Sequence, residues 1–434
     1  MNVSRVLSSW RRLERLWASP ELWLVASNLS QRVLGFCVSL LLSRYIGVQA
    51  VGAYSSVLIT AASPTSPMSA LLANNATMLS ARHHQRFSLF ELWRAQWPVM
   101  VIGLALSFSG GALLFKTSRG LQDDQISMPF MMVVAGGLII GQILTHTVVA
   151  LYVGANRAVY SSRAISIVAG LALLVVYPVL TTWGVQGVLC QAMLVMLLPG
   201  LVLLGRQLLG SKTKVTSRSE YAALRGENIQ SFRRGIPNVT ATVLTNATNW
   251  MACIYLTNRY HGDQGVGLIA IGLQWMALMQ LPVSSWGGRV MQSLAVAYAE
   301  GGGPFWKEVE NQLRRCVKVS IFASLLVVVS VPIIARLYRL DVWDFLWLMM
   351  FNGVATVFFA ISLVYERVFI CRGRQRPWLF VSVCACLVQL VVTFLLVDST
   401  LLGVAIGNMV AFMIICAAVF FHFKSISQKD RSSP

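Results

Sequence analysis

Long apolar stretches, separated by short polar segments, run along most of the 434-residue chain. Residues 128–153, 164–182 and 317–335 each approach or exceed the roughly 20 apolar residues that a helix needs to cross the hydrocarbon core of a membrane. The alternating pattern of membrane β-strands is absent from the sequence, so we expect an all-α membrane protein. The apolar segments predict about twelve transmembrane helices, at residues 22–43, 50–79, 97–115, 128–152, 164–182, 187–205, 236–258, 267–296, 319–335, 343–365, 377–397 and 401–423.

Composition and charge agree with this pattern. Hydrophobic residues make up 56% of the chain and charged residues only 12%. The net charge of +19 would also suit a nucleic-acid-binding protein. However, when the N-terminus is placed in the cytoplasm, 27 of the 35 lysine and arginine residues fall in segments on that side. Because cytoplasmic loops of membrane proteins carry such an excess, both termini are predicted to be cytoplasmic and nucleic acid is not an expected partner.

Two similar nonapeptides indicate an internal repeat. "RYIGVQAVG" at 44–52 and "RYHGDQGVG" at 259–267 share six of nine residues at an offset of 215. Further along the two halves, "GANR" at 154–157 corresponds to "GRQR" at 373–376. With six predicted helices in each half, the halves are expected to be parallel repeats related by an axis along the membrane normal. Substrate sites in such proteins tend to lie between the repeats, so a central cavity is predicted.

The predicted organisation follows from the repeat and from the polar segments. The longest polar segment, 206–235, lies between the two halves and is basic. It fits a head-group-binding or regulatory loop, or a plain cytoplasmic linker, and we prefer the linker. The predicted parts are a cytoplasmic or interfacial N-terminal segment (1–21), an N-terminal bundle of six helices (22–205), the linker (206–235), a C-terminal bundle of six helices (236–423) and a cytoplasmic tail (424–434).

Polar residues form a stripe along the first predicted helix. Asn28, Gln31 and Arg32 fall on one helical face, and Asn246 and Asn249 are spaced similarly in the seventh helix. Small and polar residues often mediate helix packing, which is the alternative explanation. An arginine near the middle of a membrane helix costs at least ~2.5 kcal/mol unless it is hydrated or paired, so we favour a hydrated cavity.

A second arginine is predicted within a membrane helix. Arg289 in the eighth helix aligns with Asn74 at the offset of 215, and Asn75 follows Asn74. Two guanidinium groups suit a diphosphate, because their planar forks bind phosphate oxygens bidentately. Alternatively, Arg289 lies near the cytoplasmic end of its helix and extends into the interface. The candidate substrate-binding residues of the cavity are Arg32, Arg289, Asn28, Gln31, Asn74, Asn75, Asn246 and Asn249.

Acidic residues are predicted to avoid the membrane interior. All 16 fall in loops or near helix ends, with Asp344 and Glu366 closest to the interior. Cation and drug antiporters normally need a carboxylate within the membrane, so this distribution argues against that function. His146, one turn after Gln142, is a candidate for proton coupling because imidazole titrates near neutral pH. It also fits a pore residue or a histidine satisfied within the bundle.

Enzymatic function is not expected. The sequence contains no nucleotide-binding, metal-binding or nucleophile motif, so no cofactor and no metal are predicted. The predicted outside loops are short, the longest being "KTSRGLQDDQIS". A membrane-embedded glycan polymerase or ligase would need a larger outside region, which counts against that class of protein.

Several segments resemble those of a known family. These are "SRYIGVQAVGAY" between the first two helices, "GANR" after the fourth, "WGVQGV" before the sixth and the basic mid-chain linker. In this order and spacing they resemble the bacterial polysaccharide flippases, the O-antigen and enterobacterial-common-antigen type members of the multidrug/oligosaccharidyl-lipid/polysaccharide exporter superfamily. The resemblance covers essentially the whole chain.

The resemblance implies a flippase of the bacterial inner membrane. Its substrate would be an undecaprenyl-diphosphate-linked oligosaccharide, moved from the cytoplasmic to the periplasmic leaflet by alternating access, with a glycan polymerase and a chain-length regulator as candidate partners. Arg32 and Arg289 match the cationic cavity residues of the family, whereas Asn74 and Asn75 depart from the pattern by standing where an arginine is common. The alternatives are a multidrug or small-cation antiporter of the same fold and a glycan polymerase or ligase.

Overall fold

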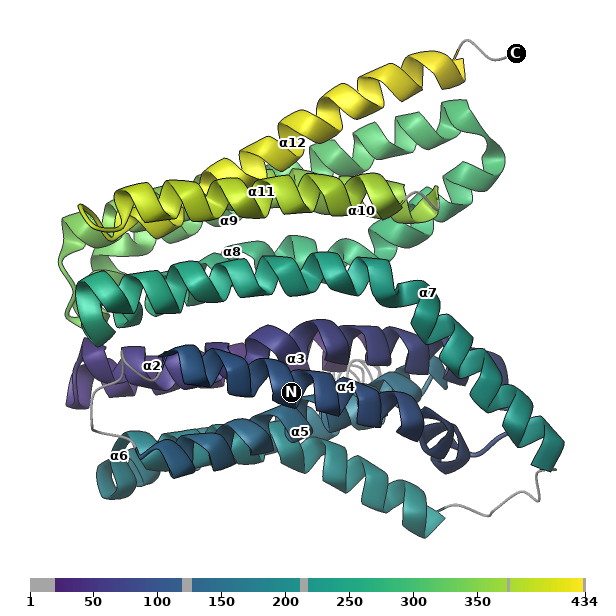
Figure 1. Ribbon diagram of the computed structural model, residues 1–434, viewed down its shortest axis with the longest axis horizontal. Coiled ribbons are helices and arrows are strands. Elements are labelled where there is room, and N and C mark those ends of the chain that lie inside the picture. Colours follow the sequence, from purple (N-terminus) through teal and green to yellow (C-terminus); the bar gives the residue numbers. More distant parts are fainter. Residues whose placement is uncertain (1–19, 119–126, 211–217, 373–374, 432–434) are drawn as a thin grey trace, which may run out of the picture. The chain divides into compact units, whose positions relative to one another are not determined.

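The structure, a computed structural model, describes residues 20–118, 127–210, 218–372 and 375–431. Every regular element in these ranges is a helix (Figure 1). The chain divides into two compact units. The first comprises Met1–Leu41, Val57–Arg119 and Asp123–Ile236, and the second comprises Leu42–Ser56, Gly120–Gln122 and Pro237–Pro434.

The helices of the first half follow the predicted apolar segments. The longest of them is broken at Gly184, where φ is 57° and ψ is −145°. Only glycine adopts this conformation readily, so the chain turns there. This long helical element therefore contains two of the predicted helices, 164–182 and 187–205. The elements are α2 (Pro20–Tyr45), α3 (Val48–His83), α4 (Leu89–Ser118), α5 (Met128–Gly154) and α6 (Ala158–Gly210).

The second half has the same kind of break. In α8 the break is at Gly262, where φ is 62° and ψ is −167°. The core of the second unit is formed by buried residues of the five helices from α8 to α12, among them Val290, Phe305, Val364 and Ile415. The elements are α7 (Arg218–Trp250), the π-helix η1 (Met251–Leu256), α8 (Thr257–Glu300), α9 (Gly302–Tyr338), α10 (Val342–Cys371), α11 (Gln375–Leu396) and α12 (Leu402–Arg431).

The helices are long and apolar enough for a multi-pass membrane protein. Among the described residues, eight helical stretches can cross a membrane by length and composition. Two of them, Ala158–Leu209 and Val239–Tyr298, contain the breaks at Gly184 and Gly262. The all-α membrane class is therefore confirmed. The total number of spans and the side on which each terminus lies remain predictions.

Much of the expected linker is helical. α6 continues to Gly210 and α7 begins at Arg218, so a helix replaces most of the predicted loop. The first part of α7 packs on the first unit, because Leu224 is buried in an apolar cluster with residues of α3, α4 and α5. The Arg94 guanidinium also lies 5.9 Å from the centre of the Tyr221 ring. These contacts supply the tertiary packing that a polar helix needs to be stable.

The last turn of α2 is held within the second unit by side-chain bonds to the end of α9. The Ser43 hydroxyl donates to the carbonyl oxygen of Tyr338 at 2.6 Å. Nε of Arg44 donates to the carbonyl oxygen of Leu337 at 2.9 Å. The last carbonyls of a helix have no partner within the helix, so these bonds satisfy groups that would otherwise need water.

Candidate functional site

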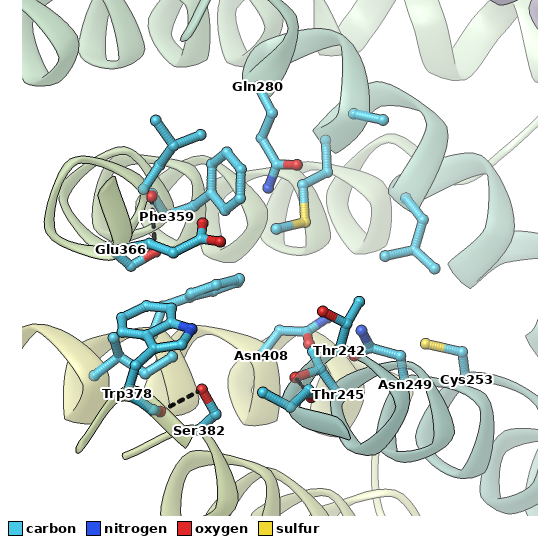
Figure 2. A pocket seen from close by; sticks show the side chains of 18 residues that line it. Thr242, Thr245, Asn249, Cys253, Gln280, Phe359, Glu366, Trp378, Ser382 and Asn408 are labelled. Carbon is cyan, nitrogen blue, oxygen red and sulfur yellow. Dashed lines mark hydrogen bonds between the residues drawn. The ribbon is translucent and has the colours of Figure 1, made fainter. Parts of the chain in front are cut away.

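A largely apolar cavity with several polar side chains lies inside the second unit, among α7, η1, α8, α10, α11 and α12 (Figure 2). Its volume is about 480 Å³, within the range of small-molecule sites. Figure 2 shows Gln280, Phe359 and Glu366 on one side of the cavity and Thr242, Asn249 and Asn408 on the other. The polar side chains of the cavity therefore lie on two walls, one from α8 and α10 and one from α7 and α12.

A buried amide network supports the second wall. Nε2 of Gln389 on α11 donates to Oδ1 of Asn249 at 2.8 Å and to Oδ1 of Asn408 at 2.6 Å. Gln389 is 3% exposed and Asn408 is 6% exposed. A buried amide without partners would be costly, so these bonds join α7, α11 and α12 and fix the orientation of both asparagine side chains.

The π-helix shapes the same wall. η1 begins directly after α7, and the Thr257 hydroxyl donates to the carbonyl oxygen of Ala252, five residues earlier, at 2.9 Å. π-helical turns widen a helix locally and are frequent at functional sites. Asn249 lies just before this turn and Cys253 within it, and both side chains line the cavity.

The polar groups of the lining are almost all neutral. The described residues around the cavity supply amides, hydroxyls, one carboxylate and the aromatic rings of Phe359, Trp378 and Phe412, but no lysine, arginine or histidine. Amides and carboxylates can pair with sugar hydroxyls, and aromatic faces can pack against the C–H faces of sugar rings. Such an arrangement can hold an uncharged saccharide.

Glu366 corrects one expectation from the sequence. The acidic residues were expected to avoid the interior, but the Glu366 side chain is half-buried and lines this cavity. It lies about one turn before the end of α10, which is why its position in the sequence placed it near a helix end. A cation antiporter therefore has one candidate carboxylate among the residues that line this cavity.

The predicted cavity residues are distributed over both units. Asn249 lines the cavity of the second unit, and Asn246 is half-buried on the same helix. Gln31 and Arg32 are half-buried on α2, in the first unit. Asn74 is exposed on α3. The side chains of Asn28 and Arg289 lie outside the described part of the structure.

Asn75 has a packing role in the structure. Its side chain is 2% exposed and its Nδ2 donates to the side chain and, at 3.2 Å, to the backbone carbonyl of Asn228. Nδ2 of Asn228 donates in turn to the carbonyl oxygen of Ala95 at 2.9 Å. This chain of amides ties α3 and α4 to the first part of α7 and directs Asn75 into a helix interface.

His146 belongs to a polar cluster of the first unit. Its side chain is exposed, with Nδ1 3.2 Å from the Ser69 hydroxyl on α3. Gln142, one turn earlier on α5, donates to the Ser66 hydroxyl at 3.1 Å. Gln142 and His146, which lie one turn apart in the sequence, therefore both face serine hydroxyls of α3. Its proton-coupling role remains a prediction.

Sequence reasoning missed Gln280, Glu366, Gln389 and Asn408. Gln389 and Asn408 stand alone in the apolar stretches "CLVQLVV" and "AIGNMVA", and neither belongs to a polar stripe. A lone amide in a membrane helix is itself a signal, since it must find a partner on another helix. For α11 and α12, this signal would have predicted a hydrogen bond between Gln389 and Asn408.

Comparisons with solved structures show the fold. The chain is similar to an inward-facing multidrug resistance MATE family transporter of the MOP superfamily, with TM-score 0.70 and 15% identity over 93% of this chain and 96% of that one. It is similar to a eukaryotic MATE transporter (TM-score 0.69, 14% identity, 97% and 98% coverage). It is also similar to the lipid II flippase MurJ in an inward closed conformation (TM-score 0.66, 14% identity, 93% and 87% coverage).

Sequence comparisons add no closer relationship. No family model matches the chain, and no curated protein matches it. The structural similarity extends over nearly the whole length of the chain and of the solved structures. The chain therefore has the fold of the MOP superfamily, which the MATE transporters and the flippase MurJ share.

Proposed function

We propose that the protein is a flippase for an undecaprenyl-diphosphate-linked oligosaccharide, in a bacterial inner membrane with both termini in the cytoplasm. The observation that carries the proposal is the cavity of the second unit, whose amides, hydroxyls and aromatic rings suit a neutral saccharide. The fold is compatible with such a substrate, because one solved structure that shares it is a lipid II flippase. A non-enzymatic transport role fits the solved structures of this fold.

In this proposal the saccharide and the diphosphate are bound by different groups. Arg32 is a half-buried arginine on a helix that also carries Gln31, and a guanidinium can grip phosphate oxygens bidentately. We assign the diphosphate to Arg32 and Arg289, with Asn28, Gln31, Asn74 and Asn246 as neutral hydrogen-bonding groups. Asn75, held by Asn228, would act indirectly, by fixing the helix that carries Asn74.

Alternating access would move the head group while the polyprenyl chain stays in the bilayer. The breaks at Gly184 and Gly262 and the prolines of α3 are among the places where helices can change direction. A glycan polymerase, which would use the transferred oligosaccharide, and a chain-length regulator are the candidate protein partners of this flippase.

A multidrug or small-cation antiporter is the second candidate function, and Glu366 favours it. A carboxylate inside a membrane bundle can bind a cation or carry a proton. The same carboxylate also accepts hydrogen bonds from sugar hydroxyls, and most of its polar neighbours are neutral amides and hydroxyls. A saccharide pairs with the amides and hydroxyls of the lining as well as with the carboxylate, whereas a cation pairs with the carboxylate and the aromatic rings and leaves the amides unused.

A deletion strain separates the two functions. We expect the strain to lose surface glycan and to keep its normal susceptibility to lipophilic cationic drugs, with a plasmid copy restoring the glycan. Normal surface glycan together with increased drug susceptibility would reject the flippase and support the antiporter.

A further inference from the structure

In the amide network, Gln389 decides whether Asn249 and Asn408 present hydrogen-bond donors or acceptors to the cavity. We infer that Gln389 turns the Asn249 and Asn408 side chains so that both present NH₂ donors to the ligand, and that the ligand there is a neutral sugar unit with acceptor oxygens toward this wall. The inference rests on the proposed function and names the chemistry of its saccharide subsite.

Gln389 is buried behind the cavity wall and does not line the cavity itself. Its side chain is 3% exposed and stands behind the wall, whereas Asn249 and Asn408 line the cavity. A glutamine Nε2 carries two hydrogens, and here each has an acceptor, one at 2.8 Å on Asn249 and one at 2.6 Å on Asn408. Gln389 is therefore a positioning residue that acts through two neighbours.

The carboxamide NH₂ groups of Asn249 and Asn408 are available to a ligand. Both Oδ1 atoms are engaged by Gln389, so the Nδ2 groups are the ends left for a ligand. Among the described residues, neither the Asn249 side chain nor the Asn408 side chain makes a further hydrogen bond. The wall from α7 and α12 thus offers hydrogen-bond donors.

The opposite wall of the cavity offers hydrogen-bond acceptors. Glu366, when ionised, only accepts hydrogen bonds, and Gln280 beside it can accept and donate. A ligand between the walls must turn acceptor oxygens toward the asparagines and O–H groups toward Glu366 (Figure 2). A sugar carries both kinds of group. A lipophilic cation has no acceptor for the asparagine NH₂ groups, and a phosphate would meet the carboxylate.

The identity of residue 389 then decides which ligand fits. A glutamate there could only accept hydrogen bonds, so both asparagines would rotate and present carbonyl oxygens to the cavity. The cavity would then contain acceptors on both walls and would suit a cation. One carboxamide in α11 thus distinguishes the two candidate functions.

The test uses the purified full-length protein in lipid nanodiscs. Thermal unfolding is followed with N-acetylglucosamine and, separately, with tetraphenylphosphonium, and the shift given by glycerol at equal concentration is subtracted from the sugar data. A ligand that binds only the folded protein raises Tm by mass action. We expect N-acetylglucosamine to stabilise the wild type and tetraphenylphosphonium to leave it unchanged.

Three variants test the positioning role. Gln389→Glu should weaken the apparent sugar affinity at least tenfold and introduce stabilisation by tetraphenylphosphonium. Asn408→Asp keeps the acceptor for Gln389 but replaces the donor on the cavity side, so it should weaken sugar binding without any change at position 389. Gln389→Met keeps a similar side-chain volume without the hydrogen bonds, so it should weaken sugar binding without introducing cation binding.

The outcomes separate this inference from the proposed function. If Gln389→Glu and Asn408→Asp bind the sugar as the wild type does, or if the wild type does not bind it, the inference is wrong, even where the deletion strain loses surface glycan. If the wild type binds tetraphenylphosphonium and the deletion strain keeps its glycan, the proposed function fails as well. Should Gln389→Glu not fold, Asn408→Asp decides.

Discussion

Gly52 lies so close to Asp263 that a Cβ atom at position 52 would overlap the Asp263 carbonyl oxygen. The contact is repeated with the roles exchanged, since a Cβ atom at Gly267 would overlap the carbonyl oxygen of Val48. At the offset of 215, Gly52 aligns with Gly267 and Val48 with Asp263, so the two contacts are equivalent members of the repeat. The shared glycines of the two nonapeptides thus mark a close backbone contact.

Substitution at this contact should destabilise the protein. Gly52→Ala and Gly267→Ala each force two backbone segments apart, and we expect a lower Tm in detergent and a lower yield of folded protein. Gly35→Ala is the matched control, because a Cβ atom there meets nothing within 4 Å and alanine favours a helix over glycine by roughly 1 kcal/mol. Gly52→Ala unfolding at or above the Tm of Gly35→Ala would contradict the contact.

The neighbouring asparagines of α3 should behave differently. Asn75→Ala leaves the buried side chain of Asn228 without its partner, which costs about 1–3 kcal/mol of stability. Asn74→Ala removes an exposed side chain, so its stability should stay within about 0.5 kcal/mol of the wild type. Denaturant unfolding of both variants checks this, and equal losses would count against the packing role of Asn75.

The cluster around Glu227 predicts acid sensitivity. Burial alone would raise the pKa of Glu227, but hydrogen bonds from Arg82 and His83 outweigh burial and lower this pKa below its ordinary value of 4.5. The bonds measure 2.7 Å and 2.9 Å. A lowered pKa in the folded state means that stability is present above about pH 4.5 and is lost as pH falls through the folded pKa.

Thermal unfolding between pH 3 and pH 7 measures this effect. Glu227→Gln should have a lower Tm at neutral pH and a shallower decrease toward acid than the wild type. Glu220→Gln, on the same helix, serves as the control, because the Glu220 side chain is exposed. An unchanged acid slope in Glu227→Gln would show that other groups govern the acid response.

Arg32 should be needed for transport and dispensable for folding. Arg32→Ala removes the guanidinium to which we assign the diphosphate, so surface glycan should fall by at least tenfold while the protein remains in the membrane at normal amounts. Arg32→Lys keeps the charge without the planar fork and should restore activity only in part. Full complementation of a deletion strain by Arg32→Ala would refute the assignment.

Glu366 should distinguish the two candidate functions further. If the carboxylate accepts hydrogen bonds from a sugar, Glu366→Gln retains an acceptor and should keep part of the glycan-restoring activity, whereas Glu366→Ala should lose more. If the carboxylate binds a cation, both variants should be inactive. Surface glycan and susceptibility to lipophilic cationic drugs, both measured in the two complemented strains, give the answer.

The fold was largely predictable because its signals are local. Most predicted apolar segments fall within a described helix, although 236–258 extends over α7, η1 and the start of α8. The repeat placed glycines at the turns, where Gly47 has a φ of 124° and Gly262 a φ of 62°. The helical start of α7 was missed because residues 218–235 are polar and are stabilised by tertiary contacts such as that of Leu224. A segment of this kind shows no membrane-helix pattern.

The candidate site was less predictable, because a hydrogen bond between distant helices leaves no mark in local periodicity. Asn249 was selected from a polar stripe, but its partner Gln389 lies 140 residues later in an apolar helix. Asn75 was chosen by its place beside Asn74, and only the structure shows that Asn228 holds it. Helix ends assigned from sequence also placed Glu366 outside the interior.

The leaflet distribution of the lipid-linked saccharide in a deletion strain tests the central claim most directly. Undecaprenyl-diphosphate-linked repeat units would be extracted and quantified from cells and from membrane vesicles of both orientations, treated with a membrane-impermeant glycan-modifying reagent. We predict that these units accumulate on the cytoplasmic leaflet and that a plasmid copy of the wild-type chain restores their outward transfer. Normal outward transfer in the strain that lacks the protein would contradict the flippase function.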